Sequence, residues 1–225
     1  RLPSAHGAMI EPATFIPVAE ATGMIVQLGD WVAEEVCRQF IDWREKGMPP
    51  IRIAMNISTL QFRQRGFARR LLNIIQGRGV DPACLQIELT ESSLAECVGE
   101  AMETLTELHT SGIQIALDDL GMGYSSLNLI CHLPLDKLKV DRAFVSALHQ
   151  DQASKAIAEV IIAMGKALGL AIVGEGVDSE QTLGYLRRQG CQQVQGNFLA
   201  EPMPPADFLK WYDQYSQARS SQPLH

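Results

Sequence analysis

The sequence predicts an α/β fold, and within that class a (β/α) barrel of which this chain carries about six of the eight strands. Six short β-rich runs alternate with helical stretches along 225 residues, which is typical of a parallel sheet built from βα units. Each apolar run also finishes on a polar or charged residue, which is costly unless it lies in a polar opening. In a TIM-like barrel all such strand ends meet at one face, where the chemistry takes place.

The elements follow from local signals along the chain. The six predicted strands are IRIAMNI, LQIEL, IQIALDD, LDKLKVD, LAIVGEG and QQVQGNF. Four helices are expected from their caps and stop signals: 31–46 capped by Asp30 and ended by Gly47, one ending at Ser111 before Gly112, 153–168 before Gly169, and one that Ser179 opens and that ends before Gly190.

The strand count indicates that the barrel is incomplete at its amino-terminal side. An open doubly wound sheet would use fewer strand ends, clustered at one switch point. A barrel of this class has eight strands in about 250 residues, whereas two helical segments precede the first of the six runs here. About two strands are therefore expected before Arg1. We expect one domain over residues 1–215, incomplete at its start, and a flexible tail over 216–225.

Composition excludes several classes of protein. The hydrophobic fraction of 46% and the charged fraction of 20% are ordinary for a soluble globular chain. The net charge of −7 argues against DNA or RNA as a partner, because nucleic acids are held mainly by positive charge. The five scattered cysteines include no C-x-x-C pair, which indicates reduced thiols and a cytoplasmic location. A full-length protein could still be anchored in a membrane through segments upstream of this chain.

The polar strand ends supply a set of hard oxygen donors. Asn56, Glu88, Asp118 and Asp119 follow three consecutive strands, and oxygen ligands without Cys or His suit Mg²⁺ or Mn²⁺ better than zinc. The neighbouring carboxylates of Asp118 and Asp119 repel each other unless cations lie beside them. The alternative is a helix cap beside a surface acid that the helix dipole stabilises. The glycine-rich turn over residues 121–126 is a candidate loop for receiving an anion.

Three later strand ends carry further candidate site residues. Lys139 and Asp141 lie two residues apart and therefore on the same face of one strand. They could form a buried ion pair, or Lys139 could direct its charge at a phosphate oxygen or an attacking water. Glu175 lies between two glycines, which leaves space around it for a ligand. Gln195 ends the last strand and could orient a water through its amide.

Taken together, these segments resemble the EAL domain family. The resemblance covers about Pro12 to Pro204, and six motifs occur in the family's order and spacing: Asn56-Ile-Ser-x-x-Gln61, Glu88-Leu-Thr-Glu91, Asp118-Asp119-Leu-Gly-Met-Gly-Tyr-Ser-Ser, Leu138-Lys139-Val-Asp141-Arg142, Gly174-Glu175-Gly176-Val and Gln195-Gly196. The resemblance implies a TIM-like barrel with one antiparallel strand. It also implies a phosphodiesterase that hydrolyses the bacterial second messenger cyclic di-GMP to linear pGpG with two Mg²⁺ or Mn²⁺ ions.

The same resemblance implies a role for each matching residue. Asn56, Glu88 and Asp118 would bind the first metal, and Asp118, Asp119 and Glu175 the second. Lys139 would hold the nucleophilic water, and Gln195 would help to place it. Four further residues would bind the substrate or support loops: Glu91, which would steady the loop after Asp119, and Gln61, Asp141 and Arg1. The family also implies a homodimer through the face near the Asp119 loop and a GGDEF or sensor domain upstream.

The chain departs from the family's pattern in several places. The Glu-Ala-Leu-x-Arg signature is absent because the chain starts later, with Arg1 as the candidate for its last residue, so the isolated fragment is expected to be inactive. Other departures are Leu120 and Met122 in place of Phe and Thr, and Asn197 and Glu201 in place of an aromatic and a basic residue. Two alternatives stay open: a non-catalytic cyclic di-GMP receptor or regulatory module, and a barrel with unrelated chemistry such as an Mg²⁺-dependent lyase.

Overall fold

The computed structural model describes residues 2–3, 9–95, 98–121 and 127–220. Two strands of two residues each, β1 (Leu2–Pro3) and β2 (Met9–Ile10), pair antiparallel at the start of the chain. Helices α1 (Pro12–Ala21) and α2 (Ile25–Glu45) follow before the main sheet begins. The sequence predicted both helical segments but not the short hairpin, whose strands are too brief to show a period.

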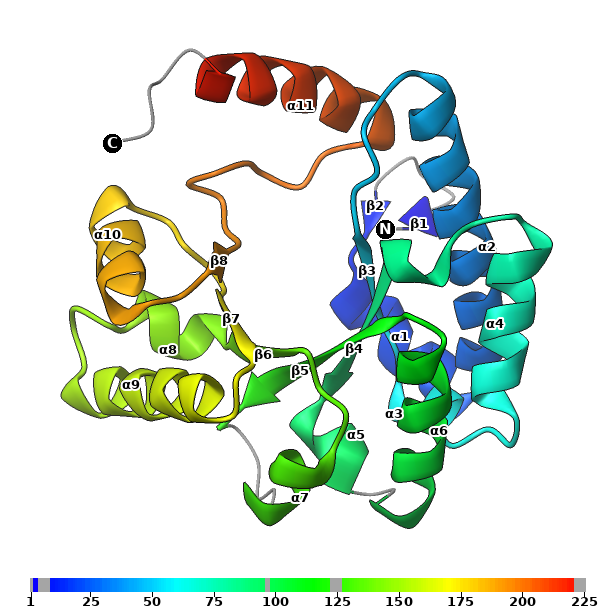
Figure 1. Cartoon of the computed structure of the whole chain (residues 1–225), viewed down its shortest axis with the longest axis horizontal. Coiled ribbons are helices and arrows are strands. Elements are labelled where there is room, and N and C mark those ends of the chain that lie inside the picture. Colours follow the sequence, from blue (N-terminus) through cyan, green and yellow to red (C-terminus); the bar gives the residue numbers. More distant parts are fainter. Residues whose placement is uncertain (1, 4–8, 96–97, 122–126, 221–225) are drawn as a thin grey trace.

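One curled parallel sheet forms the centre of the molecule (Figure 1). Its six strands lie in chain order: β3 (Ile53–Asn56), β4 (Leu85–Thr90), β5 (Gln114–Leu120), β6 (Lys137–Val140), β7 (Ala171–Gly174) and β8 (Gln193–Val194). Each strand pairs in parallel with the next. All six predicted strands are present, and the half-barrel that they form confirms the predicted fold class.

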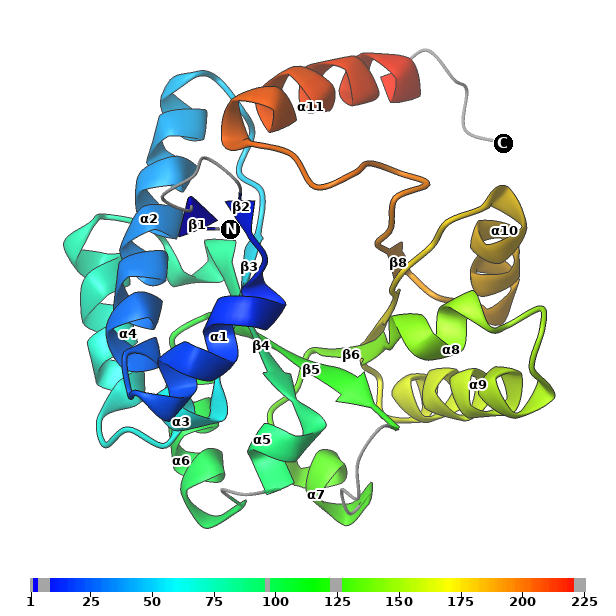
Figure 2. The same ribbon diagram turned by 180° about the vertical axis from the view of Figure 1, so that it is seen from behind.

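The longer helices that connect the strands cover the convex side of this sheet (Figures 1 and 2). Between β3 and β6 the chain forms α3 (Thr59–Phe62), α4 (Phe67–Gly77), a 3₁₀ turn η1 (Pro82–Cys84), α5 (Glu91–Ala95), α6 (Val98–Thr110) and α7 (Leu127–His132). After β6 come α8 (Arg142–Ser146), α9 (Gln152–Ala167), α10 (Glu180–Gln189) and α11 (Pro205–Ser220). Among the described residues, no helix is long and apolar enough to cross a membrane.

The two faces of the sheet carry different chemistry. Because side chains alternate along a strand, Ile87, Ile115 and Leu138 face outward and are fully buried against the helices. The alternate positions face the concave side and include Glu88 and Lys139. The apolar core therefore lies between sheet and helices, while polar groups collect inside the curl. The sheet thereby directs the candidate site residues toward one another.

The prediction that Asp30 caps a helix is wrong. Helix α2 begins at Ile25, so Asp30 lies inside it, and its Oδ1 instead accepts a hydrogen bond from Arg70 Nε at 3.0 Å on α4. The apolar residues before Asp30 continue the helical period and extend the helix by more than a turn. Ser179 does cap α10 as predicted, since its hydroxyl accepts from the Thr182 amide at 3.2 Å.

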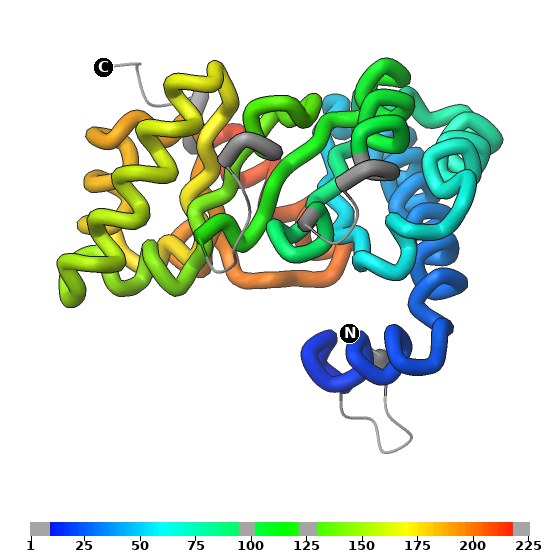
Figure 3. Tube along the Cα trace, turned by 90° about the horizontal axis from the view of Figure 1, so that it is seen from below, coloured from blue at the N-terminus to red at the C-terminus, as the bar shows by residue number. Residues whose placement is uncertain are grey.

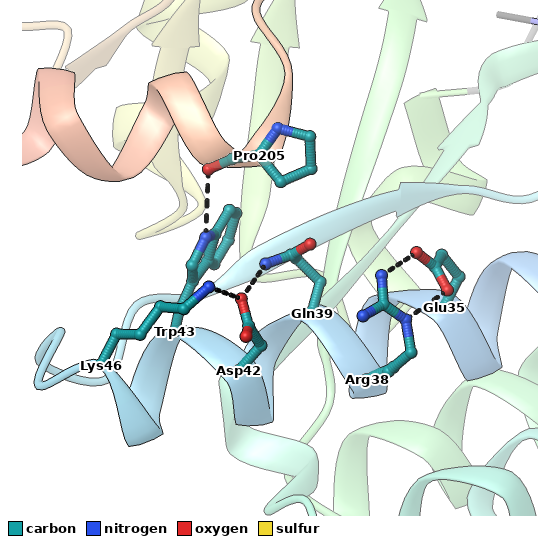
Figure 4. Close-up of polar contacts among 7 residues, drawn as sticks. All are labelled: Glu35, Arg38, Gln39, Asp42, Trp43, Lys46 and Pro205. Carbon is teal, nitrogen blue, oxygen red and sulfur yellow. Dashed lines mark hydrogen bonds and ion pairs between the residues drawn. The ribbon is translucent and has the colours of Figure 1, made fainter.

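The last helix packs against the end of α2. In Figure 1 α11 lies between the β8 side and the β3 side of the molecule. The Trp43 indole of α2 donates to the Pro205 carbonyl at 3.3 Å (Figure 4), and its ring packs 5.0 Å from the Phe208 ring. The segment expected to be a flexible tail from residue 216 is helical as far as Ser220, because it continues α11. Residues 221–225 lie outside the described residues.

Helix α1 is held less closely than the others. Figure 3 shows it standing off from the strands and the other helices, and none of its residues is buried. Val18 on this helix and Met24 just after it are each more than three-fifths exposed. The four cysteines that the structure describes with their side chains are free thiols: Cys37, Cys84, Cys131 and Cys191.

A close backbone approach at Gly196 fixes the turn after β8. A Cβ atom at this position would clash with the backbone oxygen and nitrogen of Val177. Gly196→Ala should therefore lower the free energy of unfolding by about 1–3 kcal/mol. Gly77→Ala is the matched control, because Gly77 lies in α4 with open space around it. That change should stabilise the protein by about 0.5–1 kcal/mol. Urea unfolding measures both, and equal effects would refute the predicted clash.

Candidate active site

Three carboxylates from three elements converge on one buried ammonium group. Lys139 Nζ lies 2.6 Å from Glu88 Oε2, 2.6 Å from Asp118 Oδ2 and 2.6 Å from Glu175 Oε1. The lysine is only 3% exposed, and Glu88 and Asp118 are also buried. These residues belong to β4, β5 and β6 and to the position just after β7. Four of the predicted site residues are thus brought into direct contact. The alternative ion pair between Lys139 and Asp141 is not observed, because Lys139 pairs with these other acids.

The electrostatics of this group are unbalanced. Burial alone would lower the pKa of Lys139, but its hydrogen bonds to Asp118, Glu175 and Glu88 outweigh burial and raise that pKa above its ordinary value. Burial raises the pKa of Glu175, and Lys139 opposes this rise only in part. Counted at their formal charges, three carboxylates and one ammonium leave two negative charges in excess. A site with this excess attracts additional positive charge.

The second carboxylate oxygens of Glu88 and Asp118, which do not face Lys139, each accept a hydrogen bond. Gln86 Nε2 donates to Glu88 Oε1 at 2.9 Å, and the Asp119 backbone amide donates to Asp118 Oδ1 at 2.9 Å. The sequence reasoning missed Gln86, although its position two residues before Glu88 places it on the same face of β4. Inspecting the inward positions below each acidic strand end could have identified it.

Asp119 is held in a backbone conformation that L-residues rarely adopt, with φ at 55°. Burial, the neighbouring charges of Asp118 and Asp141, and a side-chain hydrogen bond with Asp141 all raise the pKa of Asp119. Asp141 in turn caps α8, where its Oδ1 accepts from the Ala143 amide at 2.7 Å. Strain and crowded negative charge at one residue are typical of functional sites rather than of structural ones.

Two predicted support residues make structural contacts. Glu91 is 4% exposed, and its Oε2 accepts from the Gly121 amide at 2.9 Å, which ties α5 to the turn after Asp119. Residues 122–126 of the predicted anion-receiving loop lie outside the described residues. Gln61 is 5% exposed and forms a capping box with Ser58 at the start of α3. Its side chain also packs against Gly29 of α2, so it supports the loop after β3.

The remaining predicted residues lie at the same edge without a direct contact to Lys139. Asn56 ends β3 and pairs in register with Glu88. Gln195 follows β8 and is exposed, and its backbone amide donates to the Gly174 carbonyl at 2.8 Å. Asn56 thus ends the strand next to Glu88, and Gln195 follows the strand next to Glu175, so the two positions flank the carboxylate group. Arg1 lies outside the described residues.

A cavity of about 690 Å³ opens beside this group, between the ends of β3 and β4 and the helices α1 and α2. Asn56 and Glu88 line it, so the cavity adjoins the carboxylates. One wall is apolar and includes Phe15 and Trp31, whereas the facing wall carries hydroxyl groups. Among these, Ser93 Oγ lies 2.7 Å from Thr59 Oγ1. A volume of this size is ordinary for a small-molecule site.

The donor set fits a hard divalent cation. All candidate ligands are oxygens, and the excess of negative charge matches a divalent ion. Among the described residues, no group of three or more His, Cys, Asp or Glu side chains is arranged to hold a metal ion. The geometry gives the reason, because Glu88, Asp118 and Glu175 each direct an oxygen at the Lys139 ammonium.

Fold and site together define a barrel-type α/β protein with an acidic, cation-attracting centre at the carboxyl ends of its strands. The chain belongs to the EAL domain family, whose model matches residues 1–202. The EAL domain family is a hydrolase family, and its phosphodiesterases are metal-dependent. The resemblance that the six motifs predicted is therefore confirmed.

Relatives and solved structures agree with this assignment. The chain is 40% identical over 204 residues to the bifunctional diguanylate cyclase/cyclic di-GMP phosphodiesterase MucR of Pseudomonas aeruginosa, covering 91% of this chain and 30% of MucR. It is 36% identical over 215 residues to the cyclic di-GMP phosphodiesterase PdeR of Escherichia coli, covering 96% and 32%. The chain thus spans about a third of the length of these relatives.

Among solved structures, a PaMucR phosphodiesterase in complex with c-di-GMP superposes with a TM-score of 0.89 at 38% identity, covering 92% of this chain and 84% of that one. The EAL domain of Mycobacterium smegmatis DcpA superposes with a TM-score of 0.78 at 34% identity, covering 84% of each chain. The half-barrel of this chain therefore has the family's fold.

Removing the central ammonium should destabilise the protein. Lys139→Met would leave three buried carboxylates without their cation, and we expect the free energy of unfolding in chelator at pH 7 to fall by about 3–5 kcal/mol. Burial raises the pKa of Glu175, and a carboxylate whose pKa is raised in the folded state opposes folding only when it is ionised. The deficit should therefore shrink as pH falls toward about 4. Urea unfolding across this pH range measures it.

Lys137 provides the matched control on the same strand and face. It is also buried, and burial lowers its pKa, but it makes no ion pair or hydrogen bond within the described residues. Lys137→Met should change the free energy of unfolding by less than about 1 kcal/mol or stabilise the fold. Equal losses from the two substitutions would contradict a special role of the carboxylate group.

Proposed function

We propose that this EAL domain hydrolyses cyclic di-GMP to linear pGpG with two Mg²⁺ or Mn²⁺ ions. The observation that carries the proposal is the convergence of Glu88, Asp118 and Glu175 on Lys139 at the carboxyl ends of neighbouring strands. Similarity to the PaMucR phosphodiesterase in its c-di-GMP complex supports the substrate. The adjoining cavity has room for part of a dinucleotide.

The ligands divide between two ions. Asn56, Glu88 and Asp118 would hold the first, and Asp118, Asp119 and Glu175 the second. Asp118 is suited to serve both, because it lies between Glu88 and Glu175 around the same ammonium and is followed at once by Asp119. Two divalent ions supply a water activated at neutral pH and neutralise charge on the phosphoryl oxygens.

Within this arrangement the chain's own side chains would position the attacking water and hold the turn after Asp119. The pKa of Lys139 is raised in the acidic group, so the lysine acts as a hydrogen-bond donor and a fixed positive charge, and would help to hold the attacking water. Gln195 stands at the exposed end of β8 and would orient that water through its amide. Glu91 holds the Gly121 turn and would keep Asp119 in its strained conformation.

The alternative is a receptor that binds cyclic di-GMP without cleaving it. At the described strand ends, all the carboxylates proposed to bind the two metal ions are present, which favours a hydrolytic enzyme over a receptor. For the whole protein, we propose a GGDEF or sensor domain upstream, in line with the length and names of the relatives. We also propose a homodimer through the face near the Asp119 loop.

Hydrolysis should depend on the identity of the metal. The full-length protein, freed of metal by a chelator, should lose turnover and regain it with Mg²⁺ or Mn²⁺, whereas Ca²⁺ should fail to restore it or should inhibit. Ca²⁺ takes longer and looser coordination than Mg²⁺, which would displace the attacking water. Chromatography of cyclic di-GMP and pGpG measures the reaction. Turnover that persists after exhaustive chelation would refute the mechanism, and metal-independent binding without turnover would identify the receptor.

Ligand and support residues should differ in the size of their effects. Asp118→Asn removes a charge proposed to serve both metals, and turnover should fall by about 1,000-fold or more. Glu91→Gln keeps the shape and one acceptor oxygen for the Gly121 amide, so turnover should fall by about 10–100-fold. The kcat of each variant, with circular dichroism as the check on folding, measures the difference. Equal losses in folded proteins would overturn this division of roles.

A further inference from the structure

Two glutamines occupy equivalent places on the concave face of the sheet. Gln86 in β4 and Gln114 in β5 are direct partners in the strand register. Each lies on the same face of its strand as a site carboxylate, two residues before Glu88 in β4 and four before Asp118 in β5. Their side chains nevertheless differ in what they contact.

Only Gln86 contacts the carboxylate group. It is 6% exposed, and its Nε2 lies 2.9 Å from Glu88 Oε1. The Gln114 side chain makes no hydrogen bond within the described residues, and its Oε1 is buried without a partner. The amide orientation of Gln86 is fixed by chemistry, because an ionised carboxylate oxygen only accepts hydrogen bonds and the amide nitrogen must face it.

The bond from Gln86 makes the two oxygens of Glu88 unequal. Oε1 is held by the amide from below, while Oε2 faces the Lys139 ammonium at 2.6 Å. Rotation of the carboxylate about its last bond would break both contacts together. A buried carboxylate with one contact could rotate between several orientations, whereas one held at both oxygens keeps a single orientation.

We propose that Gln86 is a positioning residue for the cation site: it holds Oε1 of Glu88 and thereby orients Oε2 toward the acidic centre around Lys139, where a divalent ion would bind. This proposal rests on the proposed function, because it takes Glu88 as a metal ligand. Partners that orient a ligating carboxylate contribute to affinity, and their loss typically weakens metal binding or activity by about 10–100-fold. Gln86 does not touch the substrate or the reacting atoms and acts through Glu88.

The experiment compares Gln86→Met with Gln114→Met in the full-length protein. Methionine keeps the length and most of the volume of glutamine but removes the donor. We expect Gln86→Met to raise the Kd for Mn²⁺, measured by calorimetry, and the Mn²⁺ concentration for half-maximal turnover by about 10-fold or more. Gln114→Met should leave both values unchanged, because the amide that it removes makes no hydrogen bond within the described residues.

The outcomes separate this proposal from the proposed function. An Mn²⁺-dependent hydrolase in which Gln86→Met and Gln114→Met give the same Mn²⁺ dependence would overturn the positioning role and leave the function standing. A wild-type protein that neither binds Mn²⁺ nor cleaves cyclic di-GMP would overturn both. A loss of thermal stability in Gln86→Met with an unchanged Kd for Mn²⁺ would show a structural role only, and it too would overturn the proposal.

Discussion

The contact of Lys139 with Glu88, Asp118 and Glu175 is the interaction on which the rest of the structure depends. Strands β4 and β7 are three steps apart, which in a flat sheet would separate them by roughly 14 Å. Yet Glu88 from β4 and Glu175 from the end of β7 each lie 2.6 Å from one nitrogen atom. The group therefore requires a strongly curled sheet, and the curl in turn brings the strand ends into a single polar centre. The curl of the sheet and the contacts of Lys139 therefore depend on each other.

Most of this architecture could be predicted from the sequence because it depends on local patterns. Short β-rich runs located all six strands, and the polar residues at their ends include Lys139 and the three carboxylates that meet around it. Predictions failed where the outcome depends on contacts between distant segments. Asp30 resembles a helix cap, but its partner Arg70 is forty residues away. The hydrogen bond of Gln86 to Glu88 was not predicted, because only the residues at the strand ends were considered and Gln86 lies two residues before Glu88.

Backbone strain and crowded acidic groups, both of which destabilise a fold, occur together at Asp119. Asp119 has a positive φ, and its raised pKa reflects burial beside two further acids. Such strain of about 1–3 kcal/mol persists only where the surroundings enforce it. Here the Asp119 amide binds Asp118 on one side, while Glu91 holds the Gly121 amide just beyond. These contacts hold a crowded acidic turn in its strained conformation.

The two faces of the sheet explain how such a site is tolerated. The concave face is polar at two successive levels, with Gln86 and Lys137 below Glu88 and Lys139. Little of the apolar core lies there, because fully buried aliphatic side chains of the strands point outward to the helices. Stability therefore comes mainly from the convex layer. Most inward residues could change without loosening that core, which leaves the concave face free to serve chemistry. Lys139 is the exception, since the carboxylates around it have no other ammonium partner among the described residues.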